Sequence, residues 1–142
     1  MVDLKSVFHE LVKFQIELWD AIDARLRSEC DLQLTWFEVM QLLDRLPEAR
    51  VQDIAAEFSI TVGGTSKVVD RLEAAGLCRR HPNPNDRRSS VIELSAKGRR
   101  LLGKATVVFE EELQVRLGDV LPERSLEQLR QTLTTLRSAG RS

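Results

Sequence analysis

Apolar residues recur along the amino-terminal part of the chain at alternating steps of three and four residues. This spacing predicts a helix over residues 3–28. Its apolar residues form two adjacent stripes, Leu4, Val7, Leu11, Phe14, Leu18 and Ala21 in one and Phe8, Val12, Trp19, Ile22 and Leu26 in the other. A helix that is apolar over so wide an arc cannot be satisfied by one contact face. We expect one stripe to pack on the body of the protein and the other on a partner subunit, the alternative being a helix buried within its own monomer.

The same periodicity predicts two helices in the carboxyl-terminal part. Ser95 is placed to cap a helix that runs to Gly118 and is followed by a break at Leu121-Pro122. The last helix then carries leucines at steps of three, four and three residues, a spacing typical of a coiled-coil seam. These leucines are Leu126, Leu129, Leu133 and Leu136. Both ends of the chain thus have more apolar surface than one small domain needs, and we expect them to interlock in a homodimer.

The middle of the chain has a different pattern. Thr35 and Glu38 have the spacing of a capping box, which predicts the start of a helix that continues to Leu46. Arg50-Val51 is a candidate short strand. It leads into a short helix that ends at Phe58, with its apolar residues on one face.

After the connection Ser59-Ile60, a second short helix is predicted. Thr61 can accept from the free backbone N–H groups at its start, and Gly76 can take the left-handed conformation that ends it. Two extended runs follow, on either side of a tip rich in Pro, Asn and Asp, which is typical of a hairpin. A helix, a tight turn, a second helix and a basic hairpin make a winged helix-turn-helix, a unit that lays one helix in a DNA groove.

These elements predict a mainly α protein with a small β wing. A chain of 142 residues has the size of one domain, so we take residues 1–142 as a single domain. Within it we expect a DNA-binding lobe over residues 35–95 and dimerisation helices over residues 1–30 and 100–139.

The charge is unevenly distributed, although the net charge is only −1. Residues 1–60 hold 6 Lys/Arg against 12 Asp/Glu, whereas residues 61–100 hold 9 against 4, a net of +5. Positive charge therefore gathers on the second helix, the hairpin and the next helix start, where a phosphate backbone would lie. Lys97, Arg99 and Arg100 crowd that helix start, where cations oppose the helix dipole. This placement favours a phosphate role, the alternative being a solvated face.

Several motifs of this region occur in a characteristic order. Asp70-Arg71-Leu72-Glu73 is followed by Gly76-Leu77, the tip carries Asp86 and Arg88, and the hairpin closes in Leu94-Ser95 with Gly98 three residues on. In this order and spacing the motifs resemble the multiple antibiotic resistance regulator (MarR) family of transcription regulators. The flanking helices extend the likeness over nearly the whole chain. The resemblance implies a homodimer that binds a pseudo-palindromic operator in double-stranded DNA, and a small aromatic or anionic effector.

The second helix supplies most of the candidate DNA contacts. They are Thr61, Gly63, Gly64, Thr65, Ser66, Lys67 and Arg71. The hydroxyl groups can donate to phosphate, and Lys67 can reach a guanine edge or a phosphate. The two glycines depart from many family members, which carry Ser, Thr or Arg there. They allow close approach of the backbone to DNA, but they remove two side chains that could read bases.

Asp86, Arg87 and Arg88 are the candidate contacts of the hairpin tip. The resemblance implies that Arg88 inserts into a minor groove while Asp86 holds it in place. A narrow minor groove concentrates negative potential and favours an inserted guanidinium. The alternative is a solvated charged loop. Of Arg79 and Arg80 in the first strand, we expect one to face the DNA backbone and the other to face water.

Two further groups of residues are assigned to the dimer and to the effector. The predicted dimer interface consists of Leu4, Leu11, Leu18, Leu126, Leu129, Leu133 and Leu136. The candidate effector pocket lies between the dimerisation helices and the DNA-binding lobe and is lined by Trp19, Trp36 and Phe37. For these aromatic residues, packing in the core is the alternative.

Other classes of protein find little support in the sequence. Cys30 and Cys78 are the only cysteines and form no C-x-x-C pair, so we expect packed thiols rather than a metal site, with acidic neighbours raising the pKa of Cys30. We expect no enzymatic activity and no cofactor, because neither a nucleophile constellation nor a phosphate loop is present. Without an apolar membrane span or a signal-peptide pattern, we expect a cytoplasmic protein.

The sequence therefore predicts a sequence-specific DNA-binding transcription regulator, in the form of a repressor relieved by a small-molecule effector. The alternative from another class is a winged helix that docks on a protein without specific DNA binding. The positive charge of residues 61–100 favours DNA.

Overall fold

The computed structural model describes residues 1–58 and 61–140, with the side chain of Arg87 left out. The predicted connection Ser59-Ile60 and the terminal Arg141-Ser142 lie outside the described residues. The predicted role of the Arg87 side chain lies outside them as well.

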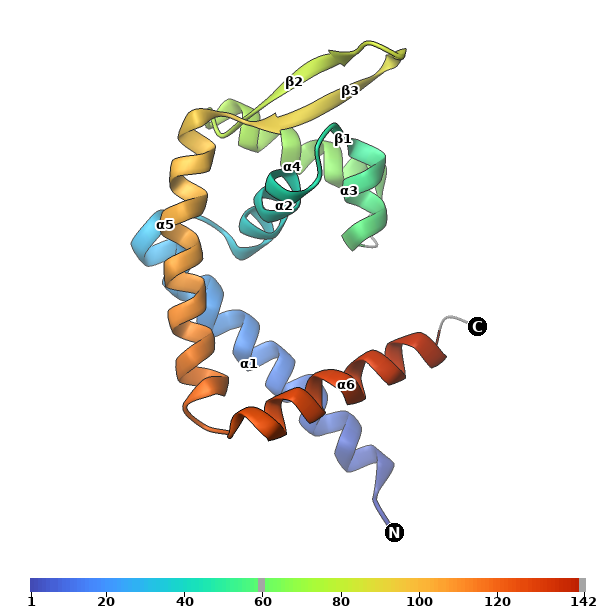
Figure 1. The fold of residues 1–142 in the computed structure, drawn as a ribbon, viewed down its shortest axis with the longest axis vertical. Helices are drawn as coiled ribbons and strands as arrows, with labels where there is room; N and C mark the ends of the chain where they lie inside the picture. The colour runs from blue at the N-terminus through green and yellow to red at the C-terminus, as the bar shows by residue number, and fades with distance from the viewer. Residues whose placement is uncertain (59–60, 141–142) are drawn as a thin grey trace.

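Helices make up most of the fold, and a small sheet forms the wing (Figure 1). The helices are α1 (Leu4–Cys30), α2 (Leu34–Arg45), α3 (Val51–Phe58), α4 (Val62–Ala74), α5 (Ala96–Leu113) and α6 (Glu123–Ala139), with a π-helical turn, η1 (Gln114–Gly118), after α5. The strands are β1 (Ala49–Arg50), β2 (Cys78–Asn83) and β3 (Asp86–Leu94). The predicted mainly α fold with a small β wing is confirmed.

The sheet is antiparallel, with the strand order β1-β3-β2. In β3, Ile92 pairs with Ala49 of β1, and Leu94 pairs with Cys78 of β2. The predicted short strand at Arg50-Val51 lies one residue earlier, because Val51 already begins α3. The long β2–β3 hairpin extends beyond the helices at one end of the molecule (Figure 1).

One core fills the space between the carboxyl-terminal part of α1, α2, α3, α4, the sheet and α5. Its fully buried side chains include Leu26, Phe37, Met40, Ile54, Val69, Leu72 and Ile92. The ring of Phe37 packs on that of Phe109 from α5, with the ring centroids 4.9 Å apart. The part from α2 to β3, residues 34–94, is called the winged lobe below. It is packed on α5 through this core.

Helix α2 begins in a way that the sequence pattern did not predict. Its first residue is Leu34, and no side chain of its cap residue Gln33 binds the helix start. Instead Asp23 of α1 accepts a hydrogen bond from the Leu34 backbone N–H at 2.8 Å. The predicted capping box of Thr35 and Glu38 is therefore wrong. A carboxylate from a neighbouring helix accepts a hydrogen bond from a free N–H group at the helix start instead.

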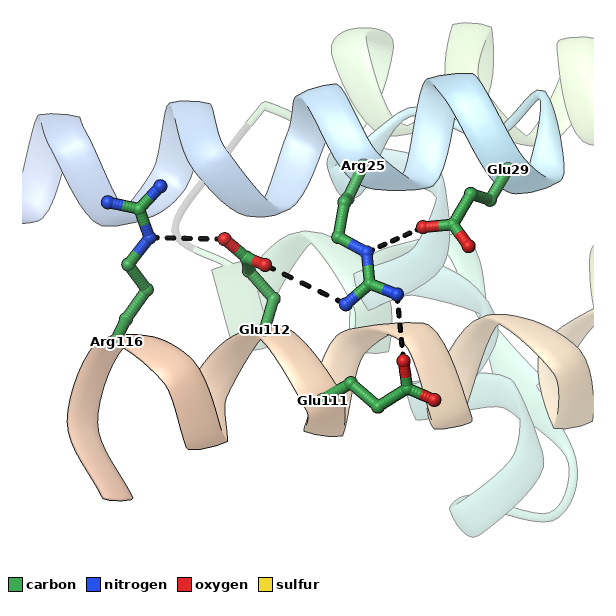
Figure 2. Close-up of polar contacts among 5 residues, drawn as sticks. All are labelled: Arg25, Glu29, Glu111, Glu112 and Arg116. Carbon is green, nitrogen blue, oxygen red and sulfur yellow. Dashed lines mark hydrogen bonds and ion pairs between the residues drawn. The ribbon is translucent and has the colours of Figure 1, made fainter. Parts of the chain in front are cut away.

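An ion-pair network joins α1 to α5 (Figure 2). Arg25 of α1 binds Glu111 at 2.8 Å and lies 3.7 Å from the carboxylate of Glu112, both on α5. Glu29 contacts the same guanidinium from within α1, and Arg116 binds Glu112 at 3.1 Å. Hydrogen bonds to Glu29 and Glu111 raise the pKa of Arg25 above its ordinary value. The network helps to fix how α1 lies against α5.

The amino-terminal half of α1 and the whole of α6 project from the body at the end of α5 remote from the wing (Figure 1). None of the residues of α6 is buried, and Leu129 and Leu133 each keep 38% of their surface exposed. On α1, Phe8 is 60% exposed. Within the described part of the chain, these apolar faces are covered by nothing.

Candidate nucleic-acid interface

Helix α4 begins and ends as its sequence predicts. Thr61 accepts a hydrogen bond from the Gly64 backbone N–H at 2.9 Å and caps the helix. At the other end Gly76 has a φ of +76°, a conformation that glycine adopts without steric cost. The predicted cap and stop are both confirmed.

The two faces of α4 differ in polarity. Val69 and Leu72 are buried in the core, so the opposite face points outward. Lys67, Asp70 and Arg71 are exposed on that side, and Ser66 is half-buried at its edge. This face is polar and carries the side chains that could reach a groove.

The structure corrects the prediction that the Thr65 hydroxyl contacts a DNA phosphate. The Thr65 side chain is fully buried, and its hydroxyl donates to the Thr61 carbonyl at 2.9 Å. Thr65 lies on the core side of the helix with Val69, four residues on, so the predicted side-chain contact with DNA is wrong.

The two glycines at the start of α4 differ in their surroundings. A Cβ atom at Gly63 would meet nothing within 4 Å, whereas one at Gly64 would lie 3.0 Å from the Thr61 hydroxyl. The protein's own packing therefore explains a glycine at 64, where the cap is tight. It does not require one at 63.

The tip of the wing is held by side-chain bonds to its own backbone. Asp86 accepts from the backbone N–H of Arg88 at 2.9 Å, and Asn83 accepts from that of Asn85 at 2.9 Å. Arg88 itself is exposed. Asp86 thus positions Arg88 by shaping the turn on which it stands, and no ion pair between their side chains is present among the described contacts.

Arg80 has a role that the sequence analysis missed. Its guanidinium turns toward α4 and binds Asp70 at 2.6 Å and Glu73 at 2.9 Å, while Arg79 is exposed. Strand alternation could have indicated this, because Arg80 falls on the same face of β2 as the buried Cys78. One of the two arginines was expected to face the DNA backbone and the other water; Arg80 instead faces two carboxylates of α4.

The start of α5 is packed closely against the end of α4 and the start of β2. Ser95 caps α5 by accepting from the Gly98 backbone N–H at 3.0 Å, and it donates to the Gly76 carbonyl at 2.6 Å. A Cβ at Gly98 would lie 2.1 Å from the Leu77 carbonyl oxygen. Lys97 donates to the Ala75 carbonyl at 2.9 Å, so its ammonium group serves the end of α4. Its predicted phosphate role loses support from this bond.

A cavity of about 710 Å³ lies where the end of α1 meets the starts of α2 and α5. Its lining includes four cationic side chains together with Trp36 and Cys30; the cations are Arg27, Lys97, Arg100 and Lys104. Burial raises the pKa of the Cys30 thiol, and the Glu29 charge adds a smaller contribution in the same direction. The predicted direction is right, but burial rather than the acidic neighbourhood is its main cause.

The three aromatic residues predicted to form an effector pocket do not meet in this cavity. Only Trp36 lines it. Phe37 is fully buried against Phe109 in the core, and Trp19 is 39% exposed on α1. The prediction is therefore wrong for Phe37, whose alternative as a core residue is confirmed, and Trp19 lies outside the cavity.

The described residues contain no helix long and apolar enough to cross a membrane. Within the same residues, no group of three or more His, Cys, Asp or Glu side chains gathers in a way that could hold a metal ion.

Comparison with known proteins gives consistent matches. Residues 32–90 match the model of the MarR family. An uncharacterized HTH-type transcriptional regulator of Bacillus subtilis, YfiV, is 30% identical over 71 residues, which are 50% of this chain and 44% of YfiV. The chain spans less than half the length of the first curated relatives that it matches.

Solved structures resemble the fold over its whole length. Sco3205, a MarR family transcriptional regulator from Streptomyces coelicolor solved in complex with DNA, has a TM-score of 0.91 at 19% identity and covers 100% of this chain and 91% of its own. The transcriptional repressor CouR, bound to a 23-mer DNA duplex, has a TM-score of 0.85 at 26% identity, with 96% and 99% covered. Together with the motifs of α4 and the wing, these matches show that residues 32–90 are similar to the MarR family and that the chain has the fold of the MarR-family structures.

Proposed function

We propose that this protein is a DNA-binding transcription regulator, a repressor that acts as a homodimer on a pseudo-palindromic operator in the cytoplasm. The carrying observation is that the outward face of α4 and the tip of the wing present Lys67, Arg71 and Arg88 to solvent on one lobe. Sco3205 and CouR, which share the fold, were solved with DNA. The single domain then divides into a DNA-binding part over residues 35–95 and dimerisation helices over residues 1–30 and 100–139.

In this proposal the start of α4 enters the major groove. The N–H groups of its first turn carry a partial positive charge that favours phosphate. Thr61, Gly63 and Gly64 lie at this start, Lys67 reaches a base edge or a phosphate one turn later, and Arg71 lies near the same face. The open space beside Gly63 supports a close approach of the backbone to DNA.

The wing would read the neighbouring minor groove through Arg88, with Asp86 fixing the turn and Arg87 adjacent. Groove width sets how favourable an inserted guanidinium is. We therefore expect the contribution of Arg88 to depend on the A/T content of the flanks, and that of Lys67 to depend on one base pair of each half-site.

The dimer would form through the apolar faces that a single chain leaves uncovered. They include Leu4, Leu11, Leu18, Leu126, Leu129, Leu133 and Leu136, of which Leu18 and Leu126 are half-buried and the others exposed. Two symmetric α4 helices meeting one side of the DNA require half-sites about one helical turn apart, roughly 10 bp from centre to centre.

The effector site of this proposal is the cavity lined by Trp36 and the four cations. An aromatic acid fits that lining, since its ring can stack on the indole and its carboxylate can pair with Arg100 or Lys104. The cavity touches both the end of α4 and α5. An occupant could therefore change the position of the winged lobe relative to the dimer helices.

Salt titration of DNA binding tests the central proposal. Footprinting on DNA that flanks the protein's own gene would define the operator. Log K should then fall with log salt by about 0.9 for each phosphate contact. A nearly flat slope would favour the alternative of a protein-docking winged helix.

Two substitutions separate the reading elements on that operator. Lys67→Ala should cost about 1–3 kcal/mol of binding and relax the preference at one position in each half-site if Lys67 reads a guanine. If Lys67 touches only phosphate, all sequences should weaken alike. Arg88→Ala should cost more on operators with A/T-rich flanks. Equal binding by Arg88→Ala and the parent on both kinds of flank would show that the wing tip is a solvated loop.

The effector proposal needs its own measurement. In a Trp19→Phe background, millimolar benzoate should quench the remaining Trp36 fluorescence and weaken operator binding. Replacing Arg100 and Lys104 by Gln should remove both responses. Quenching that survives the double substitution would place the aromatic acid elsewhere.

A further inference from the structure

Arg80 is a cation of the winged lobe to which the proposal above assigns no contact with DNA. It stands on β2, with its side chain 25% exposed. One guanidinium nitrogen binds Glu73 at 2.9 Å, and another binds Asp70 at 2.6 Å and approaches the Ser66 carbonyl at 3.4 Å. Its backbone N–H also donates to Glu73, at 3.0 Å.

These bonds join the wing to α4. Among the described residues, Arg80 supplies every ion pair between α4 and the two strands of the wing. Another polar contact there is a long one from the Cys78 thiol to the Val69 carbonyl, at 3.8 Å. Partial burial lowers the pKa of Arg80, but the bonds to Asp70 and Glu73 outweigh it and hold that pKa above its ordinary value.

The arrangement has a geometric consequence. Lys67 on α4 and Arg88 at the wing tip belong to different elements that meet different grooves in the proposed complex. Once one of these two residues has bound DNA, the effective concentration of the other residue at its own groove is high only if the two elements keep a fixed separation. The planar fork of Arg80, bonded to two carboxylates one turn apart on α4, restricts that separation.

The bonds of Arg80 to Asp70 and Glu73 also have an electrostatic consequence. Asp70 and Glu73 lie on exposed positions of the helix that carries Lys67 and Arg71. Two free carboxylates there would repel DNA phosphates and cancel the two cations of the helix. Arg80 binds both of them, so the outward face of α4 keeps its positive character.

We propose that Arg80 is a positioning residue for DNA binding, which fixes the wing against α4 and shields Asp70 and Glu73 from the phosphates. The proposal rests on the DNA-binding function proposed above. It adds a residue that touches no DNA, but on which the joint action of Lys67 and Arg88 depends.

The neighbouring Arg79 offers a matched control. Arg79→Gln and Arg80→Gln remove the same charge from adjacent residues of one strand, and Arg79 is exposed. With the full-length dimer and a duplex that carries the footprinted site, Arg80→Gln should weaken binding roughly tenfold more than Arg79→Gln at the same salt. Because ion pairs near the surface stabilise folds only modestly, the two variants should unfold at similar temperatures.

A double-substitution cycle tests the geometric part. Arg88→Ala should weaken binding strongly in the parent and much less in the Arg80→Gln background, since an unfixed wing no longer places Arg88 in its groove. An equal penalty in both backgrounds would overturn the positioning role. Arg80→Lys keeps the charge but loses the fork, so it should keep the parent's salt slope and still reduce this coupling.

Rescue tests the shielding part. Adding Asp70→Asn and Glu73→Gln to Arg80→Gln should recover part of the affinity, but not the dependence on A/T-rich flanks that Arg88 confers. No recovery would overturn the shielding role. Equal losses for Arg79→Gln and Arg80→Gln would overturn the inference while leaving the DNA-binding function in place. A parent protein without salt-dependent binding would instead overturn the function itself.

Discussion

On α4, the apolar side chains of Val69 and Leu72 are fully covered by the rest of the chain, and the face that remains outside is polar. On α6, the opposite holds: no residue is buried, and Leu129 and Leu133 lie open although they follow an equally regular spacing. Both helices are amphipathic, but only the first finds its partner within the chain. An exposed polar face suits a polyanion, whereas an exposed apolar seam suits a second protein surface.

Helix α1 belongs to both regions. Its carboxyl-terminal part contributes Ile22 and Leu26 to the core and is held on α5 by the Arg25 network. Its amino-terminal half carries the exposed apolar residues. The helix therefore connects the winged lobe to the surface that we assign to the dimer, and a change at one can reach the other through it.

The largest effect is expected from charging the seam of α6. Leu129→Asp combined with Leu133→Asp should dissociate the dimer and lower operator affinity about 10²- to 10⁴-fold, because the second half-site loses its tethered partner. Sedimentation velocity gives the mass, and a binding isotherm gives the affinity. Gln131→Asp with Thr135→Asp adds the same charge on the opposite side of α6 and should leave both unchanged. A parent protein that sediments as a monomer at micromolar concentration would contradict the dimer.

Truncating one leucine in α4 and one in α6 should distinguish the two helices, because only the α6 variant should change stability in a way that depends on protein concentration. Leu72→Ala removes a fully buried side chain and should cost about 2–5 kcal/mol of unfolding free energy at any protein concentration. Leu133→Ala should instead lower the unfolding temperature by an amount that varies with protein concentration, since it weakens association. Thermal unfolding at two concentrations a hundredfold apart measures the difference. Parallel behaviour of the two variants would mean that α6 is stabilised within its own chain.

Gly63→Ala tests whether the outward face of α4 approaches DNA closely. The added methyl group meets no protein atom, so the fold should gain up to about 1 kcal/mol from higher helix propensity. Operator binding should nevertheless weaken if the backbone at this position lies against the DNA. Unfolding and DNA-binding measurements on the same sample decide it. Gly64→Ala is a less informative change, because its methyl group would press on the capping hydroxyl of Thr61.

The smallest effect is expected at the cysteines, which belong to the covered part of the molecule. Burial raises the pKa of Cys78 to about 11 and that of Cys30 above its ordinary value, so both should be thiols at pH 8. A disulfide reagent should react slowly with the native protein and rapidly in denaturant. The folded state holds these protons more tightly than the unfolded state. The stability that the raised pKa of Cys78 contributes to the folded state is therefore complete below about pH 9 and is lost as the pH rises toward 11. Complete native labelling within minutes would contradict the burial.

Much of the fold follows from residues that act on their immediate neighbours. The caps at Thr61 and Ser95 and the stop at Gly76 depend on contacts within about one helical turn, and the structure has all of them as predicted. Periodicity likewise predicted the exposed seam of α6. Such features are local, so a single sequence contains the physics that determines them.

The structure alone decided what depends on a partner distant in the sequence. Asp23 reaches across from α1 to start α2 and makes the capping box of Thr35 unnecessary. Arg80 finds two carboxylates on α4, which turns a presumed DNA or solvent contact into an internal one. Trp19 stays at the surface of α1, Trp36 lines the cavity and Phe37 is buried against Phe109, because packing of distant elements sets which faces of α1 and α2 are covered. By itself the sequence determined which helices form and which faces are apolar, since both depend on neighbouring residues. Only the tertiary structure decided which polar groups meet, because hydrogen bonds and ion pairs require atoms within a few ångströms and that proximity is set by packing.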